Sequence, residues 1–209
     1  QQLLNPAIFR LLGEVNGKKI FDAGCGNGYL SRMMAKRGAT VVALEPAESL
    51  YQYCIRCELQ EPLGIRYVQQ DLSSAEGFGS DFDAVVANMV LLDIPDYQEA
   101  MRVCITALKP GGIFIFSLRH PCFPGGDDDW RRVGHVAIKE YFAQIPVKAT
   151  WGYNFYRPLS WYFSVLFEHG CVIDDFIEPQ LSAEFAKEHP DKSKSFHVPQ
   201  FVLVRAKLL

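Results

Sequence analysis

A chain of 209 residues, 49% of them hydrophobic and 22% charged, has the length and composition of one folded domain and excludes a mainly disordered protein. Its longest nearly uncharged apolar stretch, Ala84 to Leu92, is too short for a membrane-spanning helix, which needs about 18–20 residues. The net charge is -3 and no run of Lys and Arg exceeds two residues, so we expect a soluble protein without a nucleic-acid partner.

The first 120 residues alternate between short β-branched runs and helix-like segments, which is the pattern of a parallel sheet covered by helices on both faces. The spacing of Asp96 and Glu99 predicts a capped helix start, and Pro110-Gly111-Gly112 is expected to end that helix. The predicted strands are Lys19–Ala23, Thr40–Leu44, Ile65–Gln69, Phe82–Asn88 and Ile113–Ser117. The predicted helices are Gly28–Arg37, Glu48–Leu59 and Tyr97–Leu108.

The pattern changes after the fifth strand, where residues 118–158 are irregular and rich in Pro, Gly and aromatic side chains. We expect a lid or substrate-binding insertion in this segment. A helical stripe beginning at Leu159 and two late strands, Cys171–Ile177 and Gln200–Ala206, follow it. We therefore predict a single α/β domain over residues 1–209.

Cysteine and carboxylate patterns favour neither disulfides nor a metal site. The six cysteines are scattered and no secretory signal precedes them, so we expect a reducing cytoplasm. Cys54-x-x-Cys57 lies in a predicted helix and lacks the second ligand pair of a zinc site, which predicts core or partly buried thiols. The consecutive carboxylates Asp127–Asp129 cannot all face one ion, so we expect no required metal.

A glycine loop, Gly24-Cys25-Gly26-Asn27-Gly28, connects the first predicted strand to the first helix. Glycines let the backbone turn tightly and approach a ligand, and the free N–H groups at a helix start favour an anionic group. A dinucleotide site has the pattern G-x-G-x-x-G, but Tyr29 occupies the position of its third glycine. A dinucleotide-binding domain of similar topology is the alternative interpretation.

Two carboxylates follow neighbouring predicted strands, at the edge where this architecture binds ligands. Glu45 ends the second strand, where a carboxylate can accept both hydrogen bonds of a ribose diol and suits a positively charged ligand. Asp71 follows the third strand, where its carboxylate or neighbouring backbone can recognise an adenine amino group. Each feature alone is also typical of a tight turn or a solvated strand end, but together they predict an adenosine pocket.

With these motifs, the chain resembles the class I S-adenosylmethionine-dependent methyltransferases from about Lys19 to Ser117 and again in the late strands. The run from Asp22 to Gly28 is similar to the first motif of that family. The resemblance implies a doubly wound, Rossmann-like sheet of seven strands, mostly parallel, with the last strand antiparallel. It also implies S-adenosylmethionine as cofactor and S-adenosylhomocysteine as product.

The same resemblance implies how residues of this chain contact the cofactor. Glu45 would bind the ribose, Asp71 and Leu72 the adenine, and backbone groups at Gly24 and Asn88 the methionine portion. Pro46 and Met89 would pack around the adenosine. The cofactor-binding residues predicted in this way are Asp22, Gly24, Cys25, Gly26, Glu45, Pro46, Asp71, Leu72, Asn88 and Met89.

The candidate catalytic residue is His120, immediately beyond the fifth strand. Methyl transfer from a sulfonium depends largely on positioning, and a base is needed only for a poor nucleophile. An imidazole with a pKa of about 6.5 can remove a hydroxyl or ammonium proton near neutral pH. The alternative is that His120 only binds the loop or contacts substrate.

Aromatic residues of the 118–158 segment can line a pocket for a planar or apolar substrate, although core packing explains several of them equally well. Arg157 can bind an acidic group or cap the following helix. The predicted substrate-binding residues are Trp151, Tyr153, Tyr156 and Arg157.

These observations predict methylation of an O or N atom on a small aromatic or apolar metabolite. One alternative is an RNA or protein methyltransferase, and another is a cofactor-binding module without turnover. The sequence does not indicate an oligomeric state.

Overall fold

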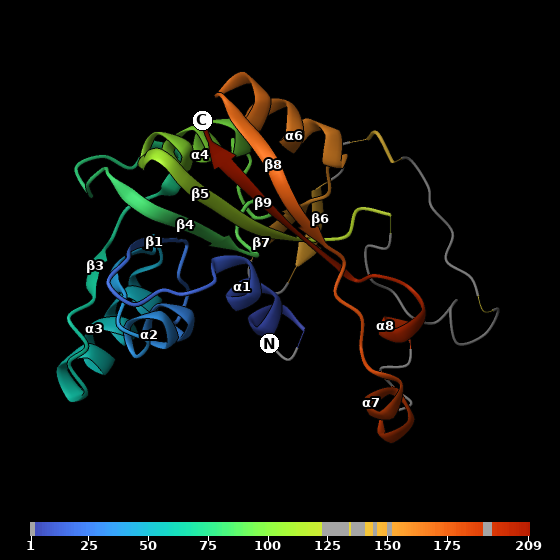
Figure 1. The fold of residues 1–209 in the computed structure, drawn as a ribbon, viewed down its shortest axis with the longest axis horizontal. Coiled ribbons are helices and arrows are strands. Elements are labelled where there is room, and N and C mark those ends of the chain that lie inside the picture. Colours follow the sequence, from blue (N-terminus) through green and yellow to red (C-terminus); the bar gives the residue numbers. More distant parts are fainter. Residues whose placement is uncertain (1–2, 123–133, 135–140, 144–145, 150–151, 190–193) are drawn as a thin grey trace.

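A seven-stranded sheet forms the centre of this computed structural model, which describes residues 3–122, 134, 141–143, 146–149, 152–189 and 194–209 (Figure 1). The strand order is β3-β2-β1-β4-β5-β9-β8. β9 pairs antiparallel with both β5 and β8, and the other neighbours pair in parallel, so the predicted sheet is confirmed. The strands are β1 (Lys19–Ala23), β2 (Thr40–Leu44), β3 (Arg66–Val68), β4 (Phe82–Asn88), β5 (Leu108–Arg119), β8 (Cys171–Ile177) and β9 (Phe201–Leu208).

Helices cover both faces of the sheet, and each face has its own apolar cluster. Side chains alternate between the faces of a strand, so the neighbours Ile20 and Phe21 of β1 belong to opposite clusters. The cluster around Ile20 includes residues of the first three helices, α1 (Leu4–Leu12), α2 (Tyr29–Ala35) and α3 (Glu48–Gln60). The cluster around Phe21 includes residues of α4 (Tyr97–Thr106) and α6 (Leu159–Glu168).

Several described elements were not among the predicted ones. These are α1, the 3-10 helix η1 (Leu72–Ser74), a hairpin of β6 (Pro146–Ala149) and β7 (Gly152–Phe155), and the short helices α7 (Ala183–Glu188) and α8 (Lys194–His197). Figure 1 shows α7 and α8 beyond the end of β8. The hairpin lies within the 118–158 segment that we expected to be irregular.

The start of β5 was predicted wrongly. Pro110-Gly111-Gly112 was expected to separate helix from strand, but β5 begins at Leu108 and runs through these residues. The pairing with β4 jumps from Phe82–Leu108 to Ala84–Ile113, so the extra residues are accommodated as an irregularity in the ladder. The helix ends earlier than predicted, at Thr106.

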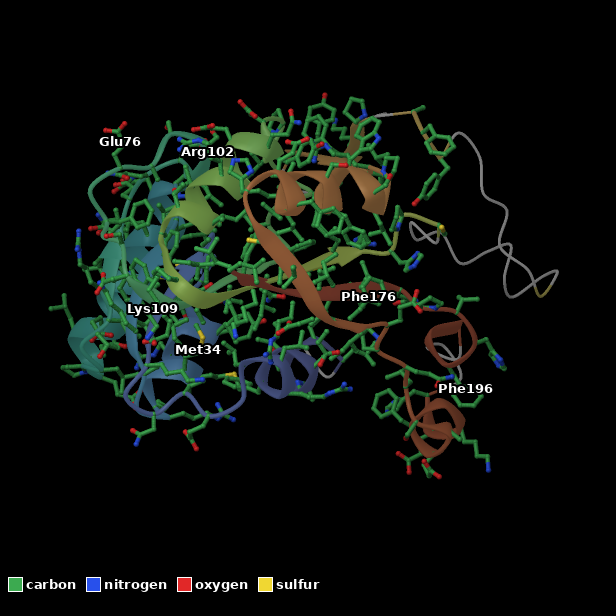
Figure 2. The ribbon with its side chains drawn as sticks, turned by 45° about the horizontal axis from the view of Figure 1, so that its top comes forward. Met34, Glu76, Arg102, Lys109, Phe176 and Phe196 are labelled. Atoms are coloured by element: carbon green, nitrogen blue, oxygen red, sulfur yellow. The ribbon has the colours of Figure 1, made fainter. Side chains whose placement is uncertain are left out.

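The carboxyl ends of the parallel strands place the candidate residues together. β1, β2, β3, β4, β5 and β8 all run in one direction, so the segments that follow them emerge at one edge. Figure 2 shows Lys109, at the start of β5, and Phe176, near the end of β8, towards opposite edges of the sheet. In the described part of the chain, no helix has the length and apolarity to cross a membrane.

Candidate functional site

The glycine loop after β1 is fixed by a carboxylate from the next strand. Glu45, which is 7% exposed, accepts the Gly26 N–H through Oε2 at 3.0 Å and the Ala47 N–H through Oε1 at 3.0 Å. The Cys25 N–H also donates to the Leu44 carbonyl at 2.8 Å. A carboxylate has about four lone-pair sites, so Glu45 keeps acceptor capacity for a ligand diol while it holds the loop.

Two glycines of this loop have different surroundings. Gly24 has φ +79, and an added Cβ there would lie 2.3 Å from Cγ2 of Val90, so no larger residue fits without displacing Val90. Gly26 has φ +58, and an added Cβ would meet nothing within 4 Å. The backbone at Gly26 therefore faces open space, and a ligand can approach it closely.

Asp22 precedes the loop and is buried, with 1% of its surface exposed. Burial disfavours its charged form and raises its pKa to about 6, while hydrogen bonds from Ser31 act in the opposite direction and the charge of Glu45 raises the pKa further. A cationic group near Asp22 and Glu45 would offset this repulsion. The electrostatics of the loop therefore suit a positively charged ligand.

A chain of hydrogen bonds connects α1 with the ends of β4 and β5. The Tyr29 hydroxyl donates to Asn5 Oδ1 at 3.1 Å and accepts from Asn88 Nδ2 at 3.1 Å. The Ser117 hydroxyl donates to Asn88 Oδ1 at 2.7 Å and accepts the Met89 N–H at 2.9 Å. This chain holds Met89 at φ 60, a conformation that residues other than glycine rarely adopt.

Asn5, Tyr29 and Ser117 were not predicted as site residues from the sequence. The position of Tyr29 could have indicated a place at the site, because it directly follows the glycine loop. Ser117 ends a strand that the pattern predicted, which places it at the ligand edge. Asn5 had no such signal, since only the fold brings α1 against α2.

The two predicted adenine contacts and Pro46 also lie at this edge. Asp71 is exposed and accepts the Ser73 N–H at 2.8 Å and the Ser73 hydroxyl at 2.6 Å, so its carboxylate caps η1. Leu72 is buried and Pro46 is exposed. Asp71 therefore shapes the turn after β3, and its exposed face leaves room for a ligand.

His120 lies at the end of β5 and is almost fully buried, at 6% exposure. Its Nε2 is 2.9 Å from Oε1 of Glu178, and its Nδ1 accepts the Cys122 N–H at 3.2 Å. Burial lowers the pKa of His120, and the neighbouring Glu178 carboxylate opposes that shift. Glu178 was missed by the sequence analysis, although it directly follows the predicted strand Cys171–Ile177.

Arg157 is buried and binds the loop between β4 and α4. Its guanidinium donates to the carbonyls of Leu91 at 3.1 Å, Ile94 at 2.8 Å and Pro95 at 2.9 Å. It also lies 4.4 Å from the centre of the Tyr97 ring. These contacts place Arg157 as an anchor between two segments of the chain.

The hairpin strand β7 is hydrogen-bonded to the loop between β4 and α4. The Phe155 N–H donates to the Leu92 carbonyl at 2.7 Å, and the Asn154 amide donates to the Asp93 carboxylate. Tyr153 is exposed and Tyr156 is half-buried, whereas Trp151 lies outside the described residues. The predicted tyrosines therefore flank a segment that is tied to the end of β4.

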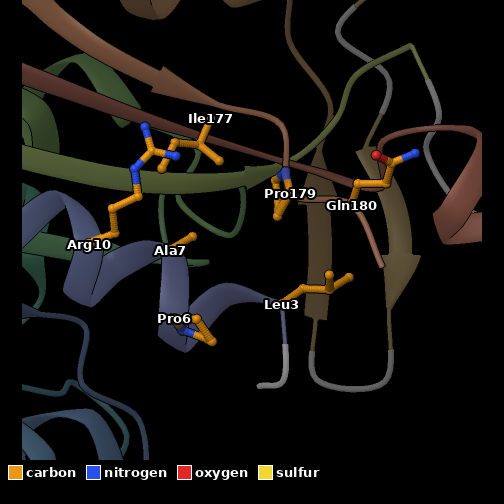
Figure 3. A pocket seen from close by; sticks show the side chains of 7 residues that line it. All are labelled: Leu3, Pro6, Ala7, Arg10, Ile177, Pro179 and Gln180. Atoms are coloured by element: carbon orange, nitrogen blue, oxygen red, sulfur yellow. The ribbon is translucent and has the colours of Figure 1, made fainter. Parts of the chain in front are cut away.

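A cavity of about 260 Å³ lies between α1 and the chain that follows β8 (Figure 3). Its lining is mainly apolar and includes one cationic and one amide side chain. The lining residues are Leu3, Pro6, Ala7, Arg10, Ile177, Pro179 and Gln180. Two residues adjacent in sequence to the lining belong to the candidate site. Asn5 accepts a hydrogen bond from Tyr29, and Glu178 contacts His120.

The thiols have the burial expected for core residues, with Cys54 buried and Cys57 half-buried. Within the residues that the structure describes, no group of three or more His, Cys, Asp or Glu side chains could hold a metal ion. Asp127–Asp129 lie outside those residues.

Comparisons with known proteins cover both the loop and the whole fold. Residues 21–116 match the family model described as "Methyltransferase domain". A ubiquinone biosynthesis O-methyltransferase of Coxiella burnetii is 33% identical over 118 residues, which are 55% of this chain and 50% of that protein. The chain thus spans about half the length of the curated relatives it matches.

Solved structures extend the similarity beyond the matched segment. The S-adenosylmethionine dependent methyltransferase from Mesorhizobium loti superposes with a TM-score of 0.84 and 26% identity, over 97% of this chain and 96% of that one. A Listeria monocytogenes protein superposes with a TM-score of 0.82 and 22% identity, over 98% and 96% of the two chains, which shows a shared fold.

Proposed function

We propose that this chain is a class I S-adenosylmethionine-dependent methyltransferase that methylates an oxygen atom of a small aromatic or apolar metabolite. The observation that carries this proposal is the arrangement of the glycine loop, Glu45 and Asn88 at one sheet edge. Oxygen is favoured over nitrogen as the acceptor because the curated relatives are named O-methyltransferases.

The residues at this edge fit the proposed cofactor. Glu45 keeps lone pairs for the ribose diol, and the backbone at Gly26 borders open space. The carboxylates of Asp22 and Glu45 suit the positive sulfonium, and its charge favours the ionised form of Asp22. Asn88 and Met89, fixed by Ser117, would hold the methionine portion through backbone groups.

The bound cofactor supplies a methyl group that is already activated for displacement. The chain's contribution is therefore to hold the acceptor oxygen in line with that carbon and to receive the acceptor's proton. We propose that residues of the 118–158 segment, with Tyr153 and Tyr156, contact the acceptor. Arg157 contributes by fixing this segment to the loop between β4 and α4.

Calorimetric titration with S-adenosylmethionine, S-adenosylhomocysteine and NAD tests the cofactor. We expect binding of the first two, and binding of NAD alone would support the dinucleotide alternative.

An acceptor panel then tests the reaction, using labelled S-adenosylmethionine with catechols, carboxylic acids, amines, total RNA and total protein. We expect label in a small molecule with a hydroxyl or carboxyl oxygen, whereas label only in amines, RNA or protein would contradict the proposal. Binding without any transfer would identify a module without turnover.

A further inference from the structure

Glu178 and His120 form a pair at the edge where the cofactor loop lies. Glu178 follows β8 and His120 follows β5, and these strands run in the same direction on either side of β9. The two side chains approach to 2.9 Å between His120 Nε2 and Glu178 Oε1. His120 is buried, but the Glu178 side chain is 45% exposed and accessible to a small molecule.

The hydrogen bonds of the imidazole assign its proton. Nδ1 accepts the Cys122 N–H at 3.2 Å, so its lone pair is already used and the proton of the neutral ring is on Nε2. The Nε2–H then donates to Glu178. The ring is held further because the His120 N–H donates to the Gln200 carbonyl at 2.9 Å. In this arrangement His120 donates a hydrogen bond and has no lone pair directed at an acceptor substrate.

Glu178 has the acceptor capacity that His120 lacks. A carboxylate offers about four lone-pair sites, of which the imidazole uses one. Its position is fixed by a buried donor, so little rotamer freedom is lost when it binds a further proton donor. The lowered pKa of His120 keeps the ring neutral near pH 7, which preserves the single Nε2–H.

We propose that Glu178 is the proton acceptor of the reaction and that His120 is the residue that positions it. The proposal rests on the proposed function. As the substrate oxygen bonds to the methyl carbon, the carbon–sulfur bond breaks and its electron pair stays on sulfur. The proton of the substrate hydroxyl passes to the Glu178 carboxylate, and it is released to water after the methylated product leaves.

Two substitutions that keep the hydrogen bond between positions 120 and 178 separate this role from a purely structural one. In Glu178→Gln the side-chain carbonyl still accepts from His120 Nε2, so a structural tie survives, but the amide cannot take a proton. In His120→Gln the amide still donates to Glu178. Glu168→Gln is the matched control, because Glu168 is exposed at the end of α6, at the opposite edge of the sheet.

The readouts are kcat and KM for transfer from labelled S-adenosylmethionine to a small-molecule acceptor that the wild type methylates. Thermal unfolding and S-adenosylhomocysteine affinity of each variant report folding and cofactor binding. For Glu178→Gln we expect kcat to fall by about 100-fold or more, with cofactor affinity within about twofold of the wild type. For His120→Gln we expect a smaller loss, and for Glu168→Gln none.

An unchanged kcat in Glu178→Gln would overturn the inference, and so would a His120→Gln loss equal to or larger than the Glu178→Gln loss. In both cases the proposed function would stand, because the wild type would still transfer the label. No transfer by the wild type to any small molecule would overturn the proposed function and this inference with it.

Discussion

Asp22 of β1 and Ser31 of α2 are joined across the glycine loop, with the Ser31 hydroxyl 2.5 Å from Asp22 Oδ2. Both residues are buried, at 1% and 0% exposure. One residue precedes the loop and the other follows it, so this hydrogen bond fixes the two ends of the loop that we propose to contact the cofactor. The geometry of the loop therefore depends on the carboxyl group of Asp22, and burial disfavours the charged form of that group.

The raised pKa of Asp22 predicts a pH-dependent stability. The pKa is about 6 in the folded protein and 3.8 for the free group, so the folded state binds more protons between these values. The contribution of Asp22 to stability is present below about pH 4 and is lost as the pH rises to about 6. In Asp22→Asn this loss is absent. Relative to the wild type, the variant should gain about 3 kcal/mol in the free energy of unfolding between pH 4 and 7.

Urea unfolding of both proteins without cofactor at several pH values measures this difference. Other carboxylates titrate alike in the two proteins and cancel. A difference between variant and wild type that does not change with pH would contradict the assignment.

Glu45→Gln tests the proposed contact between the Glu45 carboxylate and the cofactor ribose. The substitution keeps the size of the side chain but removes its charge and replaces one acceptor, next to the Gly26 or Ala47 N–H, with a donor. We expect affinity for S-adenosylmethionine to fall by about 10- to 100-fold in calorimetric titration, the range for lost hydrogen bonds to a charged group. Glu168→Gln should bind as the wild type does. Unchanged affinity in Glu45→Gln would exclude Glu45 as a cofactor ligand.

Tyr29→Phe tests the chain of hydrogen bonds from α1 to Asn88. The variant loses the donor to Asn5 and the acceptor for Asn88, so we expect the free energy of unfolding to fall by about 1 kcal/mol. We also expect weaker binding of S-adenosylhomocysteine by about 2- to 10-fold, because the backbone at Met89 is less constrained. Tyr53→Phe is the control, since that ring is 47% exposed on α3. Equal effects of both substitutions would contradict a role for Tyr29 at the site.

Arg157→Lys separates the anchoring role from substrate binding. Lysine keeps the charge but cannot reach three carbonyls with one planar group, so we expect a loss of about 2–3 kcal/mol in thermal or urea unfolding. Arg56→Lys on the exposed face of α3 should have no effect. If Arg157 instead binds an acidic substrate group, KM will rise while the unfolding midpoint stays unchanged.

Four of the strands were predicted from the sequence to the residue. β1, β2, β4 and β8 have the predicted bounds, because their runs are bordered by turn residues. The helices α7 and α8 have only six and four residues, too few for a helical period to emerge. The start of β5 was missed because Pro110-Gly111-Gly112 is typical of a turn, whereas the fold absorbs it beside β4.

The residues of the candidate site also differ in whether the sequence could indicate them. Glu45 was proposed because it follows a recognisable strand, and Asp22 and Asn88 because the chain resembles the methyltransferase family; their contacts with a cofactor stay predictions. Glu178 pairs with a residue 58 positions earlier, and Asn5 reaches Tyr29 only because α1 packs against the sheet. Such pairs depend on the strand order β5-β9-β8 and on helix packing, and no local pattern encodes them.

The most direct test of the account uses S-adenosylmethionine with an isotope-labelled methyl group. The protein is incubated with this cofactor, a small-molecule extract and the acceptor panel. Mass spectrometry then finds the product and NMR identifies the atom that carries the label. We predict a small aromatic or apolar product with one labelled methyl group on oxygen, formed by the wild type and lost in Glu45→Gln at low cofactor concentration. Label on nitrogen, label confined to RNA or protein, or no labelled product would contradict the account.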